Sequence, residues 1–253
     1  MVEAMIVAGM LLTEDNIKIS YDHYKNGNNN VVIMAPGYYN SKKSPLLKEL
    51  ASDLTDDFDV IVFDFRGHGD SKGLFHWSSK EYLDLRAVVE FAKEQYGHIC
   101  VVGFSMGGTI SIIEASVNGQ IDSLVIVSAP SDMSKVDYDI LDIDVETDIL
   151  FGLIGNGAGG KGVRPGPFWQ KKTKPVDVVH KVRAPTLYMH GEDDWLIKPW
   201  HSEELYGKTL SEKKLVMIAD GPHAEYLVRN SKSELSTSII DWFKKSMADG
   251  EQK

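Results

Sequence analysis

Gly103-Phe104-Ser105-Met106-Gly107 is the strongest structural signal in this chain. It follows an apolar run, residues 99–102, and leads directly into an apolar helical stretch that ends near residue 117. A G-x-S-x-G pentapeptide between a strand and a helix is typical of a nucleophile elbow, a tight turn with a strained apex residue. The two glycines leave room for this turn because they carry no side chains that would collide with it. The pattern predicts that the Ser105 hydroxyl stands exposed over the edge of a sheet.

Around this elbow, short β-branched runs alternate with longer helical patterns, which is typical of a mostly parallel sheet covered by helices on both faces. Residues 5–12 and 17–24, joined by a polar turn, predict a hairpin that adds an antiparallel edge. We therefore expect an α/β fold with an eight-stranded sheet. The other expected strands are 31–34, 60–63, 99–104, 124–128, 186–190 and 215–218, and the expected helices are 44–54, 79–95, 105–117, 200–210 and 224–247.

Length and composition favour one globular domain with an insertion. The chain has 253 residues, of which 43% are apolar, and this share is ordinary for a packed core. The formal charge of −10 and the lack of a dense Lys/Arg cluster argue against nucleic acid and against an anionic membrane surface as partners. The apolar start, residues 1–12, contains Glu3 and is too short to span a bilayer, so a first strand is expected rather than a signal peptide.

Cysteine usage points to a reducing compartment. Cys100 is the only cysteine and lies in an apolar strand, so no disulfide can form within the chain. Metal-ligand spacing is also absent, and the chemistry expected at the elbow needs neither a metal nor an organic cofactor. We expect a cytoplasmic protein.

One long interval, residues 131–183, separates two expected strands. A structureless loop of this length is improbable in a compact domain, so the interval predicts a small helical cap inserted into a core made of residues 1–130 and 184–253. A glycine-rich run, residues 155–162, predicts a mobile segment within the cap, and we expect Phe168 and Trp169 to contact the core. A surface insertion unrelated to substrate remains the alternative.

A serine hydroxyl needs an adjacent base, and that base needs a third group to orient it. The strand 186–190 is followed by an acidic loop that contains Asp193 and Asp194, and the strand 215–218 is followed by His223. The order Ser105, Asp194, His223 places an acid and then a histidine at later strand ends. Asp194 is the expected acid, with Asp193 and Asp132 as alternatives.

Two smaller expectations concern the surroundings of this site. His190 closes its strand just before the acidic loop and is expected to support it. An oxyanion that develops during ester cleavage needs two backbone donors. One is the Met106 N–H, directly after the serine, and the other is the Tyr38 N–H in the loop 36–40, where Gly37 permits a close turn.

The chain resembles the α/β-hydrolase superfamily of serine hydrolases, particularly its monoglyceride-lipase-like and cinnamoyl-esterase-like carboxylesterases. This resemblance implies Ser105 as nucleophile, Asp194 as acid and His223 as base, with Tyr38 and Met106 as oxyanion donors and no cofactor or metal. Many relatives have His-Gly in the oxyanion loop, whereas Pro36 stands here in place of the histidine, so side-chain support from that histidine is lost. The shared motifs are Pro36-Gly37-Tyr38, Asp64-Phe65-Arg66-Gly67-His68-Gly69-Asp70-Ser71, Gly103-Phe104-Ser105-Met106-Gly107-Gly108, His190-Gly191-Glu192-Asp193-Asp194 and Gly221-Pro222-His223.

The expected function is that of a serine carboxylic ester hydrolase for small or medium acyl esters, with a small-molecule ester as its partner. The same triad also serves thioesters, amides, peptides and acyl transfer, and the fold does not choose among these. A serine at the elbow weighs against dehalogenases and epoxide hydrolases, which use a carboxylate there. A small-molecule binding protein is the non-enzymatic alternative, and a homodimer is left open. Aromatic residues near expected loops also allow aromatic esters: Tyr38, Tyr39, Phe75, Trp77 and Trp195.

Overall fold

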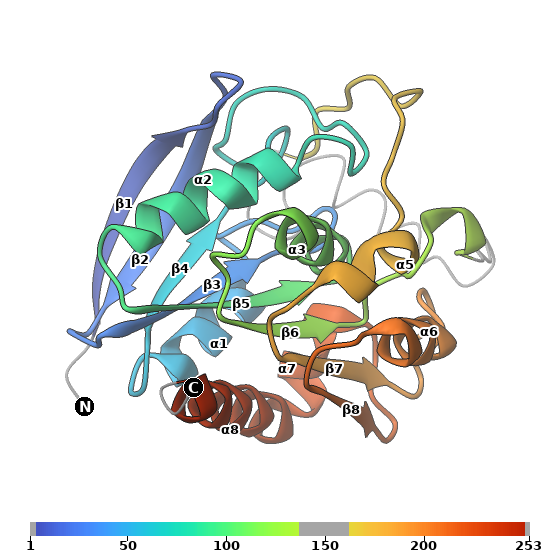
Figure 1. Ribbon diagram of the computed structural model, residues 1–253. Helices are drawn as coiled ribbons and strands as arrows, with labels where there is room; N and C mark the ends of the chain where they lie inside the picture. The colour runs from blue at the N-terminus through green and yellow to red at the C-terminus, as the bar shows by residue number, and fades with distance from the viewer. Residues whose placement is uncertain (1–3, 137–161, 251–253) are drawn as a thin grey trace.

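A single sheet between two layers of helices organises the chain in the computed structural model, which describes residues 4–136 and 162–250 (Figure 1). Within these residues the sheet has eight strands in the order β1-β2-β4-β3-β5-β6-β7-β8. The pairs β1–β2 and β2–β4 are antiparallel and all the others are parallel. The strands are β1 (Met5–Leu12), β2 (Lys18–Lys25), β3 (Asn30–Ala35), β4 (Asp59–Phe63), β5 (His98–Phe104), β6 (Ser123–Val127), β7 (Thr186–Gly191) and β8 (Lys213–Ile218).

The helices lie on both faces of the sheet, as Figure 1 shows for α2 and α3 on one side and α1 and α8 on the other. The longer helices are α1 (Pro45–Leu54), α2 (Tyr82–Lys93), α3 (Met106–Val117), α6 (Trp200–Lys208) and α8 (Lys232–Gly250). The short helical turns are η1 (Met133–Lys135), α5 (Pro175–Val178), η3 (Val179–Lys181), η4 (Ala224–Tyr226) and α7 (Leu227–Asn230).

Strand β3 shows why the central strands read as unbroken apolar runs. Val31 and Ile33 are fully buried in the core beneath α2 and α3, whereas Val32 and Met34 are fully buried in the core beneath α1 and α8. Successive side chains of a strand point to opposite faces, so a strand covered on both faces needs apolar residues at every position. This double burial confirms the predicted fold class.

The N-terminal hairpin and the parallel strands are confirmed, with ends that differ by one or two residues from those predicted. The predicted helix 224–247 is wrong as one element. It divides into η4, α7 and α8, and the break lies at Ser231, whose backbone (φ −138°, ψ 35°) leaves helical geometry. Serine favours helix starts, because its side chain competes for backbone hydrogen bonds. The helical periodicity continues across the break, which is why the sequence pattern did not reveal it.

The interval 131–183 is described at its two ends, and most of its glycine-rich run lies outside the described residues. The prediction that Phe168 and Trp169 contact the core is wrong, because their side chains are 67% and 76% exposed and pack on each other. Arg164 joins this segment to the body instead. Its guanidinium donates to the backbone carbonyls of His68, Gly69 and Ser71. The guanidinium has several N–H groups in one plane, so it can donate to all three carbonyls simultaneously.

In the part of the chain that the structure describes, no helix combines the length and the apolar character that a membrane crossing requires.

Candidate active site

Ser105 occupies the turn between β5 and α3 with a strained backbone, φ 48° and ψ −114°. Its N–H donates to the Val127 carbonyl at 2.8 Å, which ties the turn to the neighbouring strand β6. A side chain at Gly103 would lie 2.6 Å from Ser111 Oγ, and one at Gly107 would overlap the Ala35 carbonyl. The flanking glycines are therefore required by close contacts with other segments, as the elbow pattern predicted.

We expect Gly107→Ala to destabilise the fold by at least about 2 kcal/mol, because the new methyl group meets backbone that cannot move independently of β3. Urea unfolding followed by circular dichroism measures this change. Gly119→Ala is the matched control, since a Cβ there meets nothing within 4 Å. Equal unfolding midpoints for the two variants would contradict the close packing of the elbow.

His223 and Asp194 are brought together from loops after β8 and β7. The distance from His223 Nδ1 to Asp194 Oδ2 is 2.7 Å, and both side chains are buried. A carboxylate oxygen accepts, so His223 Nδ1 carries the hydrogen and Nε2 is left with a free lone pair. This tautomer is the one that a general base needs.

Asp194 is held by several donors besides His223. Its Oδ1 accepts the Leu196 and Ile197 N–H groups at 3.0 and 2.8 Å. His190 Nε2 lies 3.2 Å from Oδ2 and 2.7 Å from the Ile197 carbonyl, so this nitrogen must donate. Burial raises the pKa of Asp194, but the hydrogen bonds from His190 and His223 outweigh it and hold that pKa well below its ordinary value. Asp194 therefore stays ionised, and the predicted support from His190 is present.

The two alternative acids have other surroundings. Asp193 is exposed to solvent. Asp132 accepts from Ser134 through Oδ1 and pairs with Lys174 Nζ at 2.8 Å through Oδ2. Of the three carboxylates, Asp194 is the one with a hydrogen bond to His223.

The remaining predicted groups lie at the same edge of the sheet. Met106 is the first residue of α3, and Tyr38 follows β3 in the loop 36–40, against which Gly107 packs. Ser128 directly follows Val127, whose carbonyl accepts the Ser105 N–H. The Ser128 hydroxyl accepts from the Ala224 N–H at 3.1 Å, which places the turn that carries His223 beside the elbow. No hydrogen bond joins Ser105 to His223 within the described residues, and such contacts are often loose before substrate binds.

Aromatic rings gather around Tyr38. Its ring lies 5.1 Å from Phe75 and 6.2 Å from Trp77, measured between centroids, and Phe75 and Trp77 are 5.1 Å apart. Tyr38 and Trp77 are partly exposed, whereas Phe75 is buried. The candidate oxyanion donor therefore belongs to a residue whose side chain forms part of an aromatic wall.

A second serine–histidine–carboxylate cluster contains none of the three predicted triad residues. Ser131 Oγ is 2.8 Å from His201 Nδ1 and 2.6 Å from Glu204 Oε2. Ser131 is fully buried, and His201 Nδ1 also accepts the Ser131 N–H. These contacts use the histidine as a structural acceptor. The Ser131 side chain is inaccessible to solvent, whereas Ser105, although also buried, keeps an exposed fraction of 9%.

Burial lowers the pKa of His201 from 6.5 to about 4. The folded state therefore favours neutral His201, and its contribution to stability is present above about pH 6.5 and is lost as the pH falls through 4. An NMR titration of the imidazole resonances should show His201 neutral at pH 5. A midpoint near 6.5 would contradict this structural role.

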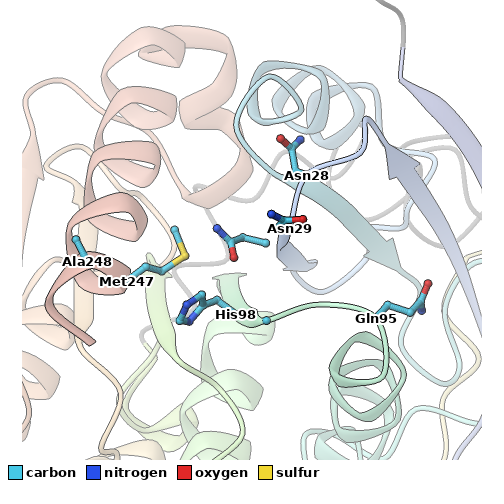
Figure 2. A pocket seen from close by; sticks show the side chains of 8 residues that line it. Asn28, Asn29, Gln95, His98, Met247 and Ala248 are labelled. Carbon is cyan, nitrogen blue, oxygen red and sulfur yellow. The ribbon is translucent and has the colours of Figure 1, made fainter. Parts of the chain in front are cut away.

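A hollow of about 600 Å³ lies at the opposite edge of the sheet, before β3 and β5 (Figure 2). Two of its amide side chains are hydrogen bonded, since Asn28 donates to the Thr55 carbonyl, and Gln95 accepts from Lys25 and donates to the Phe91 carbonyl. It contains none of the predicted site residues. Within the described ranges, no group of three or more His, Cys, Asp or Glu side chains is arranged to hold a metal ion.

Sequence reasoning missed three residues at the site: Ser128, Ser202 and Glu225. Ser202 Oγ lies 2.6 Å from His190 Nδ1, and Glu225 accepts from the Gly37 N–H at 2.6 Å. A signal was present for Glu225, an acid inside the short apolar run that follows His223.

Comparisons with known proteins agree with this architecture. A sequence profile of the alpha/beta hydrolase fold matches residues 30–147. The uncharacterized protein YqkD of Bacillus subtilis is 23% identical over 191 residues, a match that covers 68% of this chain and 58% of YqkD, so the chain spans less than two thirds of that relative. Serine hydrolase BPHL of Homo sapiens is 22% identical over 259 residues, covering 84% of this chain and 79% of that protein.

Among solved structures, the Pyrococcus furiosus esterase Pf2001 superposes with a TM-score of 0.80 and 23% identity, covering 96% of this chain and 91% of that one. The strand order of the sheet and the strained turn at Ser105 lead to the same fold as these matches. The chain therefore has the alpha/beta hydrolase fold.

Proposed function

We propose that the chain is a serine carboxylic ester hydrolase. Ser105 is the nucleophile, His223 the general base and Asp194 the acid that orients it, and the Met106 and Tyr38 N–H groups bind the oxyanion. The observation that carries this proposal is the 2.7 Å hydrogen bond between His223 Nδ1 and Asp194 Oδ2, at the sheet edge where Ser105 occupies its strained turn. The names of the similar BPHL and Pf2001 proteins, a serine hydrolase and an esterase, support it.

The reaction proceeds through an acyl-enzyme. His223 Nε2 takes the Ser105 proton as Oγ attacks the ester carbonyl, and the ionised Asp194 stabilises the imidazolium. The two N–H groups stabilise the oxyanion of the tetrahedral intermediate. His223 then protonates the departing alcohol. Water, deprotonated by the same histidine, attacks the acyl-enzyme. His223 then gives this proton to Ser105 Oγ as the acyl–oxygen bond breaks, which releases the carboxylic acid and the free serine.

The proposed substrates are esters with small or medium acyl groups, aromatic ones included. The aromatic wall of Tyr38, Phe75 and Trp77 begins at the residue that supplies an oxyanion donor. Aromatic pairs at centroid distances of 4.5–7 Å are favourable, and a substrate ring can extend such a cluster. Thioester, amide and acyl-transfer chemistry use the same groups and remain the competing activities.

A matched substrate panel tests the proposal. p-Nitrophenyl esters of acetate, butyrate, octanoate and phenylacetate vary acyl length and aromaticity with one leaving group, and a phenylacetyl thioester and anilide vary the bond cleaved. We expect turnover of the esters, with phenylacetate preferred over the longer octanoate. Turnover confined to the anilide or the thioester would contradict ester hydrolysis, and no turnover of any member would favour a binding protein.

A further inference from the structure

Glu225 is a buried carboxylate that connects two separate parts of the site. It lies in η4, two residues after His223, and is 4% exposed. Its Oε1 accepts the Gly37 N–H at 2.6 Å, across 188 positions of sequence. A buried carboxylate is costly unless it is hydrogen bonded, and here burial raises the pKa of Glu225 above its ordinary value. The hydrogen bond from the Gly37 N–H therefore indicates that the buried Glu225 carboxylate holds the loop 36–40.

The loop 36–40 is a tight turn that needs external support. The Asn40 N–H donates to the Gly37 carbonyl at 3.2 Å, and Tyr39 adopts a left-handed backbone with φ 64°. This position of such a turn favours glycine, and another residue there costs on the order of 1 kcal/mol. Glu225 reaches both ends of the turn, because its carboxylate also accepts a hydrogen bond from the Asn40 side chain.

Peptide planarity connects this clamp to the Tyr38 N–H. The Gly37 carbonyl and the Tyr38 N–H belong to one peptide plane and point in opposite directions. Because the Asn40 N–H holds the carbonyl on one side, the Tyr38 N–H is directed to the other. The hydrogen bond from the Gly37 N–H to Glu225 fixes the preceding plane. Two successive peptide planes are therefore held in place.

Gly37 fits this arrangement for a reason of space. A Cβ at this position would lie 2.9 Å from Glu225 Oε1 and 3.1 Å from Oε2, closer than side chains normally pack. Its backbone is outside the left-handed region, so the conformation alone does not demand glycine. Glycine is needed at this position because the Glu225 carboxylate approaches so closely.

We propose that Glu225 is a positioning residue, which orients the Tyr38 N–H as an oxyanion donor by clamping the loop 36–40. This inference rests on the proposed function. Glu225, near the C-terminal end of the chain, would then supply the loop support that Pro36 cannot give. The same turn carries His223, so the base and the oxyanion donor are fixed relative to each other.

The test compares Glu225→Leu, which removes the acceptor, with Glu225→Gln, which keeps an amide oxygen for the Gly37 N–H. For Glu225→Leu we expect kcat on p-nitrophenyl butyrate to fall about 100-fold, the size of one lost oxyanion donor, with KM unchanged. Glu225→Gln should restore most of this loss. In NMR amide exchange, the Gly37 N–H should lose protection in Glu225→Leu and keep it in Glu225→Gln.

Glu114→Gln is the matched control. Glu114 is a fully buried carboxylate on α3 that accepts from Arg86 at 3.0 Å through each oxygen, away from the loop 36–40. It should lower the unfolding midpoint with kcat and Gly37 protection unchanged.

Three outcomes would overturn the inference: unchanged kcat in folded Glu225→Leu, a loss confined to KM, or unchanged protection of the Gly37 N–H. Wild-type protein that shows no Ser105-dependent turnover would instead overturn the proposed function, and the exchange measurement would still decide whether Glu225 holds the loop.

Discussion

Replacing Ser105 with alanine is expected to lower kcat for ester hydrolysis by about 10⁶-fold, the effect of removing the nucleophile from a triad that acts as a unit. The alanine methyl group fits the space of the serine Cβ and leaves the strained turn intact. His223 then has no hydroxyl to deprotonate, and no acyl-enzyme can form. The loss is measured from initial rates on p-nitrophenyl butyrate, at enzyme concentrations high enough to detect the residual activity.

Ser131→Ala is the matched control because Ser131 contacts a histidine and a carboxylate outside the proposed triad and is fully buried. It should keep wild-type kcat while losing some stability. Comparable activity in the Ser105→Ala and wild-type proteins would refute the assignment of the nucleophile. A large loss of activity in folded Ser131→Ala would show that the second cluster matters for turnover.

Asp194→Asn is expected to lower kcat by about 10⁴-fold, as in a serine-protease triad where the same change leaves the histidine in the wrong tautomer. Asp194 Oδ2 accepts the His223 Nδ1–H at 2.7 Å. An asparagine NH₂ group at that position donates instead, which moves the imidazole hydrogen to Nε2 and removes the lone pair that must accept the Ser105 proton. Steady-state kcat at pH 8, with folding checked by circular dichroism, measures the effect.

The two alternative acids supply the controls. Asp193 is exposed, and Asp132 is engaged by Ser134 and Lys174. Asp193→Asn and Asp132→Asn should therefore retain near-wild-type kcat. If Asp194→Asn keeps most of its activity while one of these variants loses it, the acid has been wrongly assigned.

The fold could be predicted from local sequence because its signals are local. Strands β3 and β5 are apolar at successive positions since both faces are covered, and the elbow has glycines where neighbouring segments touch it. The break at Ser231 was missed because helical periodicity persists on both sides of it. Phe168 and Trp169 were misplaced because apolar character alone does not say whether a residue of an insertion reaches the core.

The pairing of Asp194 with His223 was also accessible, because both follow parallel strands whose carboxyl ends share one edge of the sheet. The role of Glu225 was not. Its contact with Gly37 spans 188 positions and depends on how a short turn after β8 meets a loop after β3. The apolar neighbours of Glu225 mark it as an unusual acid, but they do not identify Gly37 as its partner. Loop-to-loop contacts of this kind require coordinates.

The central claim is that Ser105 is an activated nucleophile, and covalent labelling with a fluorophosphonate probe tests it most directly. Digestion and mass spectrometry of the labelled wild-type protein locate the adduct. The account predicts one adduct on Ser105, none on Ser131, slow labelling of Asp194→Asn and no labelling of Ser105→Ala. Folded wild-type protein that remains unlabelled, or that is labelled equally after the Ser105→Ala change, would contradict it.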